Sequence, residues 1–411
     1  MEVLETKIDI QAVRARFPVL EQEVNGKPLI YFDNAASSQT PTEVINALNH
    51  FYEKDHANIH RGIHTLAERS TTAYEATRKR AQSFINSLES EEVIFTKGTT
   101  DSINLVASSW GSLNLKKGDQ ILLSQLEHHS NIVPWQLIAQ RTGAEINVIP
   151  VNDRGEILID EYQSMLNEKT KLVAVNYISN SLGTINPVKE MISLAKGVGA
   201  VTLIDAAQAA PHRKIDVQSL DCDFLALSSH KMYGPTGVGI LYGKRHLLEE
   251  MPPYQGGGEM IKDVSFTGTT YNDIPYKFEA GTPNIGDVIA FQAAIDFIKT
   301  LGHEAIESYE NELTEHATLQ LSQIDGLKLI GTAKNKASVV SFLIDGVHPY
   351  DLGQLLDSRG IAVRTGHHCT QPLMEFFNIE GTVRASFAVY NTTEEINYFS
   401  DSLRQIVAKF R

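Results

Sequence analysis

The sequence predicts an α/β fold in which a mainly parallel, seven-stranded sheet forms a large domain, followed by a smaller C-terminal α+β domain. Between about residues 90 and 245, short β-branched runs alternate with segments of helical length. This alternation is typical of a parallel sheet covered by helices on both faces. After about residue 300 the pattern changes to separated strands with helices between them, which indicates an α+β domain.

Seven apolar runs are the expected strands of the large sheet: residues 93–96, 121–123, 146–149, 172–175, 201–204, 224–227 and 237–242. The last run follows its predecessor after a short connection. We expect it to be antiparallel to its neighbour, because a parallel return needs a longer crossover. Residues 250–284 are dense in glycine and proline, which predicts an excursion across the surface.

Downstream, residues 286–323 have a helical pattern, and 339–343 and 384–389 are the expected strands of the small domain. We therefore divide the chain into three parts. An N-terminal segment, residues 1–22, is expected to pack on the small domain. Residues 23–300 form the large domain, and residues 301–411 form the small domain that carries a loop around Cys369.

Composition limits the partners and the compartment. The 411 residues include 36 Lys and Arg against 50 Asp and Glu, a formal charge of −14, which disfavours nucleic acid and anionic membranes as partners. The two cysteines, Cys222 and Cys369, lie far apart, so no disulfide framework or paired zinc motif is expected. No signal-peptide pattern and no apolar run of about 18 residues is present. We expect a cytoplasmic protein.

Lys231 is the first candidate for chemistry, because it closely follows the predicted strand 224–227. Ligands of open α/β sheets bind at the carboxyl ends of strands. A lysine amine there can form a covalent bond with an aldehyde cofactor, and Ser228 and His230 offer a hydroxyl and an imidazole for the phosphate of such a cofactor. A solvated surface lysine in a turn is the alternative.

Asp205 ends the preceding strand, 201–204. A carboxylate there can keep a pyridine nitrogen protonated and so make the ring an electron sink, while Gln208 could reach the phenolic oxygen of the ring. The alternative is an aspartate that caps a helix. The pairing of Asp205 with Lys231, each after one of two consecutive strands, favours the cofactor interpretation.

Three further strand ends carry candidate residues. Thr99 and Thr100 would lie at a helix N-terminus that binds an anion, or would only cap that helix. His128 could stack on a cofactor ring or be structural, and Asn180 could bond a ring substituent or cap a turn. No Gly-x-Gly-x-x-Gly or P-loop motif follows a predicted strand, so nucleotide binding lacks its usual anchor.

Cys369 lies in a glycine-bearing loop beside His367 and His368. An accessible cysteine there can ionise, and the thiolate is the form that attacks sulfur. An inert buried thiol is the alternative, and it suits Cys222 better. A zinc site on these three residues is strained, because adjacent residues rarely converge on one ion. Arg384 begins a predicted strand and could bind a carboxylate through its guanidinium, or form an ordinary surface ion pair.

Taken together, these residues resemble the fold-type I, class V aminotransferase-like enzymes, and within them the group II cysteine desulfurases of the SufS type. The resemblance spans nearly the whole chain and rests on an ordered set of motifs: Tyr31-Phe32-Asp33-Asn34-Ala35-Ala36-Ser37, Asn58-Ile59-His60-Arg61-Gly62-Ile63-His64, the lysine segment 228–235, Gly281-Thr282-Pro283-Asn284 and the Arg-Thr-Gly-His-His-Cys loop ending at Cys369.

The resemblance implies pyridoxal 5′-phosphate (PLP) held covalently by Lys231. It further implies His128 stacked on the ring, Asp205 at the ring nitrogen and Gln208 at the phenolic oxygen. The remaining residues are implied by role. Phosphate contacts are Thr99, Thr100, Ser228 and His230, with Thr282 reaching the phosphate of a neighbouring subunit in a homodimer; substrate contacts are Asn180, Arg364 and Arg384; Arg61 lies near the entrance. No metal is implied.

The implied reaction converts L-cysteine to L-alanine, with a persulfide on Cys369 that passes to an acceptor protein for iron–sulfur cluster assembly. Thr370 and Ser229 depart from the alanine and glycine common in the family, and we expect both to be tolerated. Tyr350 replaces a histidine found in relatives that use a zinc-bearing SufU-type acceptor, which favours a SufE-type acceptor. Alternatives are a selenocysteine lyase, another class V lyase or aminotransferase, or a non-enzymatic zinc-binding protein.

Overall fold

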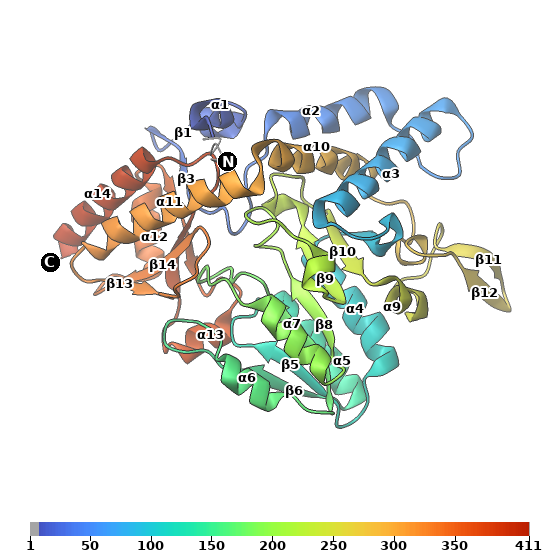
Figure 1. The fold of residues 1–411 in the computed structure, drawn as a ribbon. Helices are drawn as coiled ribbons and strands as arrows, with labels where there is room; N and C mark the ends of the chain where they lie inside the picture. The colour runs from blue at the N-terminus through green and yellow to red at the C-terminus, as the bar shows by residue number, and fades with distance from the viewer. Residues whose placement is uncertain (1–7, 411) are drawn as a thin grey trace, which may run out of the picture.

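The computed structural model describes residues 8–410 (Figure 1). The large domain is built on a seven-stranded sheet in the order β4-β10-β9-β8-β7-β5-β6. The strands are β4 (Val93–Thr96), β5 (Gln120–Ser124), β6 (Glu145–Ile149), β7 (Thr170–Asn176), β8 (Val201–Asp205), β9 (Phe224–Ser228) and β10 (Gly239–Gly243). β10 is antiparallel to both neighbours, and the pairs from β9 to β6 are parallel. The predicted strands, the short antiparallel connection and the α/β class are confirmed.

Helices cover both faces of this sheet, as the burial along β4 indicates. Val93 and Phe95 belong to one buried apolar cluster, whereas Ile94 belongs to a second, because successive strand residues point to opposite faces. The helices of the large domain are α2 (Thr42–His50), α3 (Thr65–Ile85), α4 (Thr99–Asn114), α5 (Val133–Thr142), α6 (Ile159–Met165), α7 (Val188–Gly197), α8 (Val217–Leu220), α9 (Arg245–Glu250) and α10 (Ile285–Leu301).

The glycine- and proline-rich stretch leaves the body of the domain, as expected, and contains a hairpin that the sequence did not predict. Strands β11 (Ile261–Ser265) and β12 (Gly268–Tyr271) pair antiparallel and project at the right of Figure 1. Phe266 at the turn is fully exposed. The hairpin therefore buries no apolar face of its own within this chain.

The small domain is a four-stranded antiparallel sheet in the order β13-β14-β17-β16 with helices packed on it (Figure 1, orange to red). Its elements are α11 (His303–Ser322), β13 (Leu327–Ile330), β14 (Val339–Ile344), α12 (Pro349–Asp357), β16 (Arg364–Gly366), α13 (Gln371–Phe376), β17 (Thr382–Ser386) and α14 (Thr393–Phe410). Two details of the prediction are wrong. Arg364–Gly366 was expected in a loop but forms an edge strand, and Arg384 lies in the middle of β17, opposite Arg364.

The N-terminal segment joins the two domains. Helix α1 (Ile10–Arg14) is tied to the small domain by Arg14, which donates to the Tyr390 carbonyl at 2.8 Å and pairs with Glu395 at 2.7 Å. Phe17 packs on both Phe297 and Tyr390. Residues 1–7 of the predicted segment lie outside the described residues, and the domain limits stay predictions.

The remaining short strands are β1 (Glu23–Val24), β2 (Lys27–Pro28) and β3 (Ile30–Tyr31), which pairs with β15 (Ile361–Ala362).

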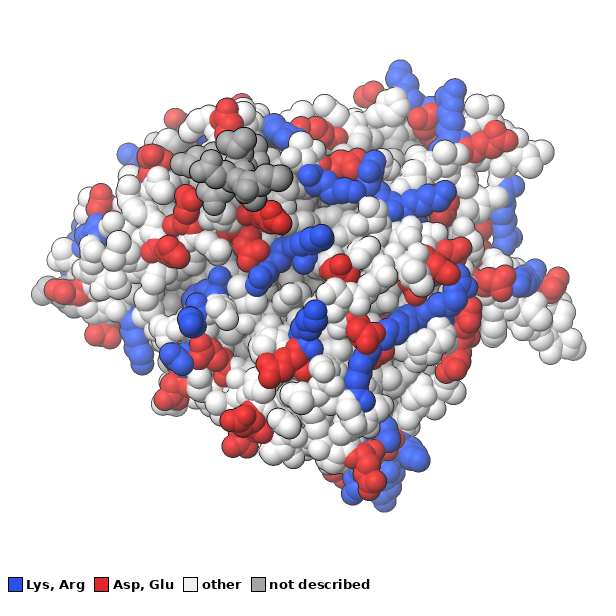
Figure 2. Space-filling view, viewed as in Figure 1, with Lys and Arg blue, Asp and Glu red and all other residues white. Residues whose placement is uncertain are grey.

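Charge is dispersed over the face seen in Figure 2, where basic and acidic side chains alternate without a continuous field of one sign. Within residues 8–410, none of the helices combines the length and the apolar character needed to cross a bilayer.

Candidate active site

One cavity of about 190 Å³ lies where the carboxyl ends of the large-sheet strands face the small domain. All the predicted site residues except Thr282 and the entrance residue Arg61 line it: Thr99, Thr100, His128, Asn180, Asp205, Gln208, Ser228, His230, Lys231, Arg364, Cys369 and Arg384. These residues come from both domains. The cavity therefore forms only when the two domains are packed together.

Lys231 reaches the cavity from a short 3₁₀ turn, Ser229–Lys231, that directly follows β9. Burial, together with Arg384 and Arg364, lowers the pKa of Lys231 to about 8, although Asp205 opposes this shift. The amine forms no hydrogen bond or ion pair with any residue that the structure describes. It is therefore a half-buried, available nucleophile that lines the cavity and not a solvated surface lysine.

Asp205 lies beside this lysine because β8 and β9 are parallel neighbours in the sheet. Its Oδ1 accepts a hydrogen bond from the Ala207 N–H at 2.9 Å, and its Oδ2 accepts none from residues 8–410. Burial raises the pKa of Asp205, while the Ala207 N–H and Lys231 act against that shift. A buried carboxylate with one free oxygen in a cavity calls for a cationic or N–H partner.

The strand-to-helix turn before α4 forms a cradle of hydroxyl groups. The Thr99 N–H donates to Ser228 Oγ at 2.8 Å, and the Thr99 hydroxyl lies 2.9 Å from the same oxygen. Gly98 has a φ of +146°, and a Cβ there would lie 3.3 Å from Ser228 Oγ. The turn therefore requires glycine, and it brings hydroxyl groups to the positive end of a helix. Burial and Lys231 lower the pKa of the adjoining His230 to about 4.

His128 caps the 3₁₀ turn His129–Asn131, with its Nδ1 2.8 Å from Ser130 Oγ. Burial, followed by the charge of Lys231, lowers the pKa of His128 to about 3, so the ring is neutral at physiological pH. Gln208 has its amide N–H engaged, since Nε2 donates to the Ala35 carbonyl at 2.7 Å. The stacking role of His128 and the phenolic contact of Gln208 stay predictions.

Arg384 is fully buried, which excludes the surface ion pair considered above. Its Nη1 donates to the Asn180 carbonyl and its Nη2 to Asp33 Oδ1, each at 2.9 Å, whereas its Nε has no hydrogen-bond partner. Asn180 in turn donates from Nδ2 to the His368 carbonyl at 2.8 Å. Asn180 and Arg384, two of the three predicted substrate contacts, thus also connect the large domain to the small one.

Cys369 is partly exposed and lines the cavity, whereas Cys222 is completely buried. Burial raises the pKa of Cys222 to about 12, as expected for an inert thiol. His368 and Cys369 have φ values of +52° and +57°, a left-handed conformation that is costly for residues with a Cβ. Contacts from elsewhere in the chain must therefore hold this loop.

The cavity fits PLP on its donor set. Lys231 supplies an amine that can lose its charge near neutral pH, and Asp205 supplies a buried carboxylate with a free oxygen. The Thr99 turn supplies hydroxyl groups at a helix N-terminus, and His128 supplies a neutral imidazole. An aldehyde, a ring nitrogen, a phosphate and an aromatic face are the groups that these side chains would complement. Within residues 8–410 no group of three or more His, Cys, Asp or Glu side chains is placed to hold a metal ion.

Sequence reasoning missed several residues around this cavity. Glu127, which is fully buried and precedes His128 in the chain, accepts hydrogen bonds from Asn131 Nδ2 at 2.7 Å and the Asn176 N–H at 3.0 Å, and also from the Ser124 hydroxyl. Burial raises the pKa of Glu127 to about 7. Its position shortly after a strand was the available signal.

Two of the predicted residues lie outside the cavity: Thr282 is exposed, and Arg61 pairs with Glu259 at 3.2 Å.

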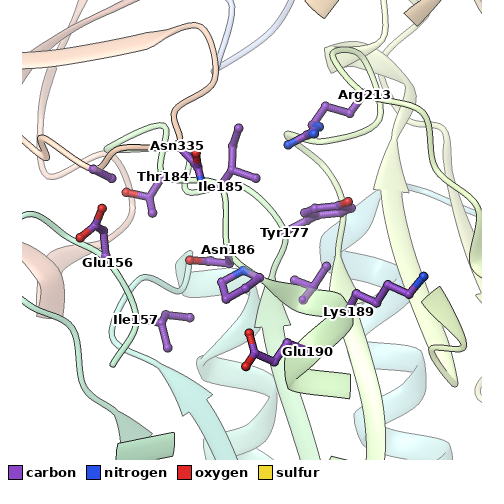
Figure 3. Close-up of a pocket in the computed structure, with 13 residues that line it drawn as sticks. Glu156, Ile157, Tyr177, Thr184, Ile185, Asn186, Lys189, Glu190, Arg213 and Asn335 are labelled. Atoms are coloured by element: carbon purple, nitrogen blue, oxygen red, sulfur yellow. The ribbon is translucent and has the colours of Figure 1, made fainter. Parts of the chain in front are cut away.

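A second, larger cavity of about 570 Å³ contains none of the predicted residues (Figure 3). Tyr177 lies between Arg213 and Lys189 in this view, and Glu156 borders the opposite side. The cavity has charged groups of both signs but no cysteine and no histidine in its lining. Its size alone therefore does not mark it as the reactive site.

Comparisons with known proteins agree with the geometry. The family model described as aminotransferase class V matches residues 30–399. A cysteine desulfurase of Synechococcus elongatus is 52% identical over 398 residues, which cover 97% of this chain and 64% of that protein. The chain thus spans less than two thirds of that relative.

Two further proteins match over nearly their full length. A cysteine desulfurase of Escherichia coli strain SE11 is 50% identical over 97% of this chain and 98% of its own. The crystal structure of the Escherichia coli cysteine desulfurase CsdA, in an S-sulfonic acid form, superimposes with a TM-score of 0.91 at 36% identity, covering 98% of this chain and 100% of that one.

Proposed function

This chain belongs to the class V aminotransferase family and, within it, to the cysteine desulfurases, and from that premise we propose that it converts L-cysteine to L-alanine and retains the released sulfur on Cys369. The observation that carries the proposal is that a half-buried amine, Lys231, and a partly exposed thiol, Cys369, line one small cavity. A carbon–sulfur bond can be cleaved there by one group that moves a proton and one that accepts sulfur.

Lys231 would hold PLP, with Asp205 at the ring nitrogen and the Thr99–Thr100 turn at the phosphate. When bound, the cofactor supplies an electron sink for the pair left by removal of the substrate α-proton. The Lys231 amine is the group that takes this proton. Its pKa of about 8 leaves a useful fraction of the amine unprotonated near neutral pH, which an ordinary lysine would not have.

Arg384 and Arg364 bind the substrate carboxylate from the small-domain side of the cavity. Arg384 already places two nitrogens on the Asn180 carbonyl and on Asp33, so its guanidinium is held rigidly. A rigid guanidinium orients a carboxylate with less loss of side-chain entropy than a free one. Asn180, which borders the same space, fixes the substrate from the large-domain side.

Cys369 accepts the sulfur. The thiolate Sγ attacks the substrate sulfur, the bond between that sulfur and the substrate β-carbon breaks, and the electron pair of that bond stays on carbon. A persulfide then remains on Cys369, and protonation of the carbon fragment gives L-alanine. Because a thiolate is the attacking species, this step requires Cys369 to be ionised.

Substitution of the thiol tests the proposal directly. Cys369→Ala should retain the bound cofactor and its visible absorbance but lose sulfide and persulfide production from L-cysteine. Cys222→Ala is the matched control, since Cys222 is buried away from the cavity, and it should keep the activity. Continued sulfur transfer by Cys369→Ala would overturn the assignment. L-Selenocysteine and cysteine sulfinate in the same alanine assay would reveal a selenocysteine lyase or a lyase of another amino acid.

A homodimer is the proposed assembly. Thr282 is exposed, and beyond the hydroxyl cradle an open cavity of about 370 Å³ runs past Asn104 and Tyr254. A second subunit whose Thr282 entered this opening would complete the phosphate site. Light scattering should give about twice the 45.5 kDa chain mass, and a monomer at micromolar concentration would refute the shared site.

A SufE-type protein is the proposed acceptor in a reducing cytoplasm, where free thiols persist. Tyr350 at the start of α12 is 59% exposed, and it offers an aromatic surface and no zinc ligand. A SufE-type acceptor should stimulate alanine release, and a SufU-type acceptor should not. The reverse preference would reject this part of the proposal.

A further inference from the structure

His129 touches the Cys369 loop with two different groups. Its backbone N–H donates to the Cys369 carbonyl at 2.8 Å. Its ring Nε2 lies 3.1 Å from the Gln371 backbone nitrogen and accepts that N–H. The histidine therefore holds one peptide group at the thiol-bearing residue and another two residues later. Both contacts cross from the large domain to the small one.

The ring contact fixes the protonation state of His129. A backbone N–H can only donate, so Nε2 must carry a lone pair and the proton of the neutral ring must be on Nδ1. Burial and the neighbouring His367 lower the pKa of His129, which agrees with a neutral ring. The His367 ring centroid lies 5.5 Å away, and His367 Nδ1 accepts the Cys369 N–H at 3.1 Å.

The loop needs such contacts because its conformation is unfavourable by itself. His368 and Cys369 both have positive φ values, and residues with a Cβ enter that region only where the surroundings hold them there. Asn180 and Gln125 add hydrogen bonds from the large domain to the carbonyls of His368 and Pro372, each at 2.8 Å. Among the described residues outside the loop, His129 alone bonds it through both its backbone and its ring.

We propose that His129 is a positioning residue that holds the Cys369 loop against the large domain, so that the thiol stays at the cavity during sulfur transfer. The inference deepens the proposed function and rests on it for the transfer step. His129 lies outside the cavity lining, so it acts through the loop and not on the substrate. His128, its neighbour in sequence, is the residue that faces the cavity.

Two substitutions distinguish the effect of losing the Nε2 hydrogen-bond acceptor from the effect of losing the histidine ring. His129→Gln keeps an oxygen at about the reach of Nε2, and His129→Leu removes the acceptor. His246→Leu, an exposed histidine on α9, is the matched control. In the cofactor-loaded protein, two measurements report on the loop without turnover: hydrogen exchange of a peptide covering 367–373, and the rate of Cys369 alkylation by iodoacetamide. Buried Cys222 should remain unmodified.

We expect His129→Leu to accelerate both exchange and alkylation about fivefold or more, the factor for one lost hydrogen bond. Its kcat for alanine release should fall by at least that factor, with the KM for L-cysteine within about twofold. His129→Gln should recover most of the loss. The inference would be overturned if His129→Leu showed the exchange and alkylation rates of the wild-type protein. It would also be overturned if His129→Gln and His129→Leu were equally impaired. If the wild-type protein releases no alanine, the proposed function fails, while the loop measurements still decide the role of His129.

Discussion

Arg384 Nη2 donates to Asp33 Oδ1 at 2.9 Å and so joins a strand of the small domain to the N-terminal loop beside the cavity. Burial raises the pKa of Asp33, and the arginine opposes that rise. Within this pair the Arg384 side chain is buried, whereas the Asp33 side chain is partly exposed. The Arg384 guanidinium also lines the cavity, where a substrate carboxylate would complete its hydrogen bonds.

Arg384→Lys should therefore weaken substrate binding more than the chemical step. The ammonium cannot reproduce the forked guanidinium contact. We expect the KM for L-cysteine to rise about 10-fold to 100-fold, because charge-assisted hydrogen bonds contribute about 1.5–3 kcal/mol. Steady-state kinetics with unchanged cofactor absorbance would check this.

Asp33→Asn serves as the comparison for that variant. It keeps the guanidinium and one hydrogen-bond acceptor, so the KM should rise less than in Arg384→Lys. If Arg384→Lys bound L-cysteine as well as the wild-type protein, the carboxylate contact would have to be assigned to another residue lining the cavity, with Arg364 the first to test.

Lys231 gives a pH-dependent prediction for the cofactor-free chain. Only the neutral amine attacks an aldehyde, and a folded-state pKa of about 8 means that the neutral fraction grows as pH rises through 8. Covalent capture of PLP, fixed with borohydride and quantified on the peptide containing Lys231, should therefore increase between pH 7 and about 9. Ordinary surface lysines should respond near their usual pKa of about 10.4. A Lys231 profile that coincides with theirs would contradict the shifted pKa.

The strands of the large sheet could be predicted because their burial leaves a direct trace in sequence. Runs such as Leu172–Val175 are apolar at every position, as both faces are covered. The hairpin β11–β12 could not, since nearly all of its residues are exposed and no alternation of apolar and polar residues marks it. The edge strand Arg364–Gly366 is equally unmarked, because three half-buried residues carry no periodic pattern.

The site shows the same division between local and long-range information. Asp205 and Lys231 were found because each follows an apolar run, and the parallel pairing of β8 with β9 then brings them together. Asp33 and His129 were not found, because their roles depend on Arg384 and on the Cys369 loop, which are distant in sequence. Local pattern thus reveals groups at strand ends, whereas residues that support them require the fold.

Glu127 and Asn131 provide a prediction on such support. Glu127 Oε2 accepts from Asn131 Nδ2 at 2.7 Å, and Asn131 Oδ1 accepts from Trp135 Nε1 at 2.9 Å. At pH 8, above the Glu127 pKa of about 7, the carboxylate is the native form. Glu127→Gln would turn an N–H toward the N–H of Asn131, and a buried donor without an acceptor costs about 1–3 kcal/mol. The melting temperature at pH 8 should fall.

The double variant Glu127→Gln with Asn131→Asp exchanges the roles of the two side chains. The amide at 127 then donates to the carboxylate at 131, whose second oxygen still accepts from Trp135 Nε1. Asn131→Asp alone should be the least stable, since two buried carboxylates would face each other. Calorimetry of the four proteins measures the coupling, and recovery of at least half of the Glu127→Gln loss is expected. A double variant no more stable than its parents would show that the two side chains are not coupled through this hydrogen bond.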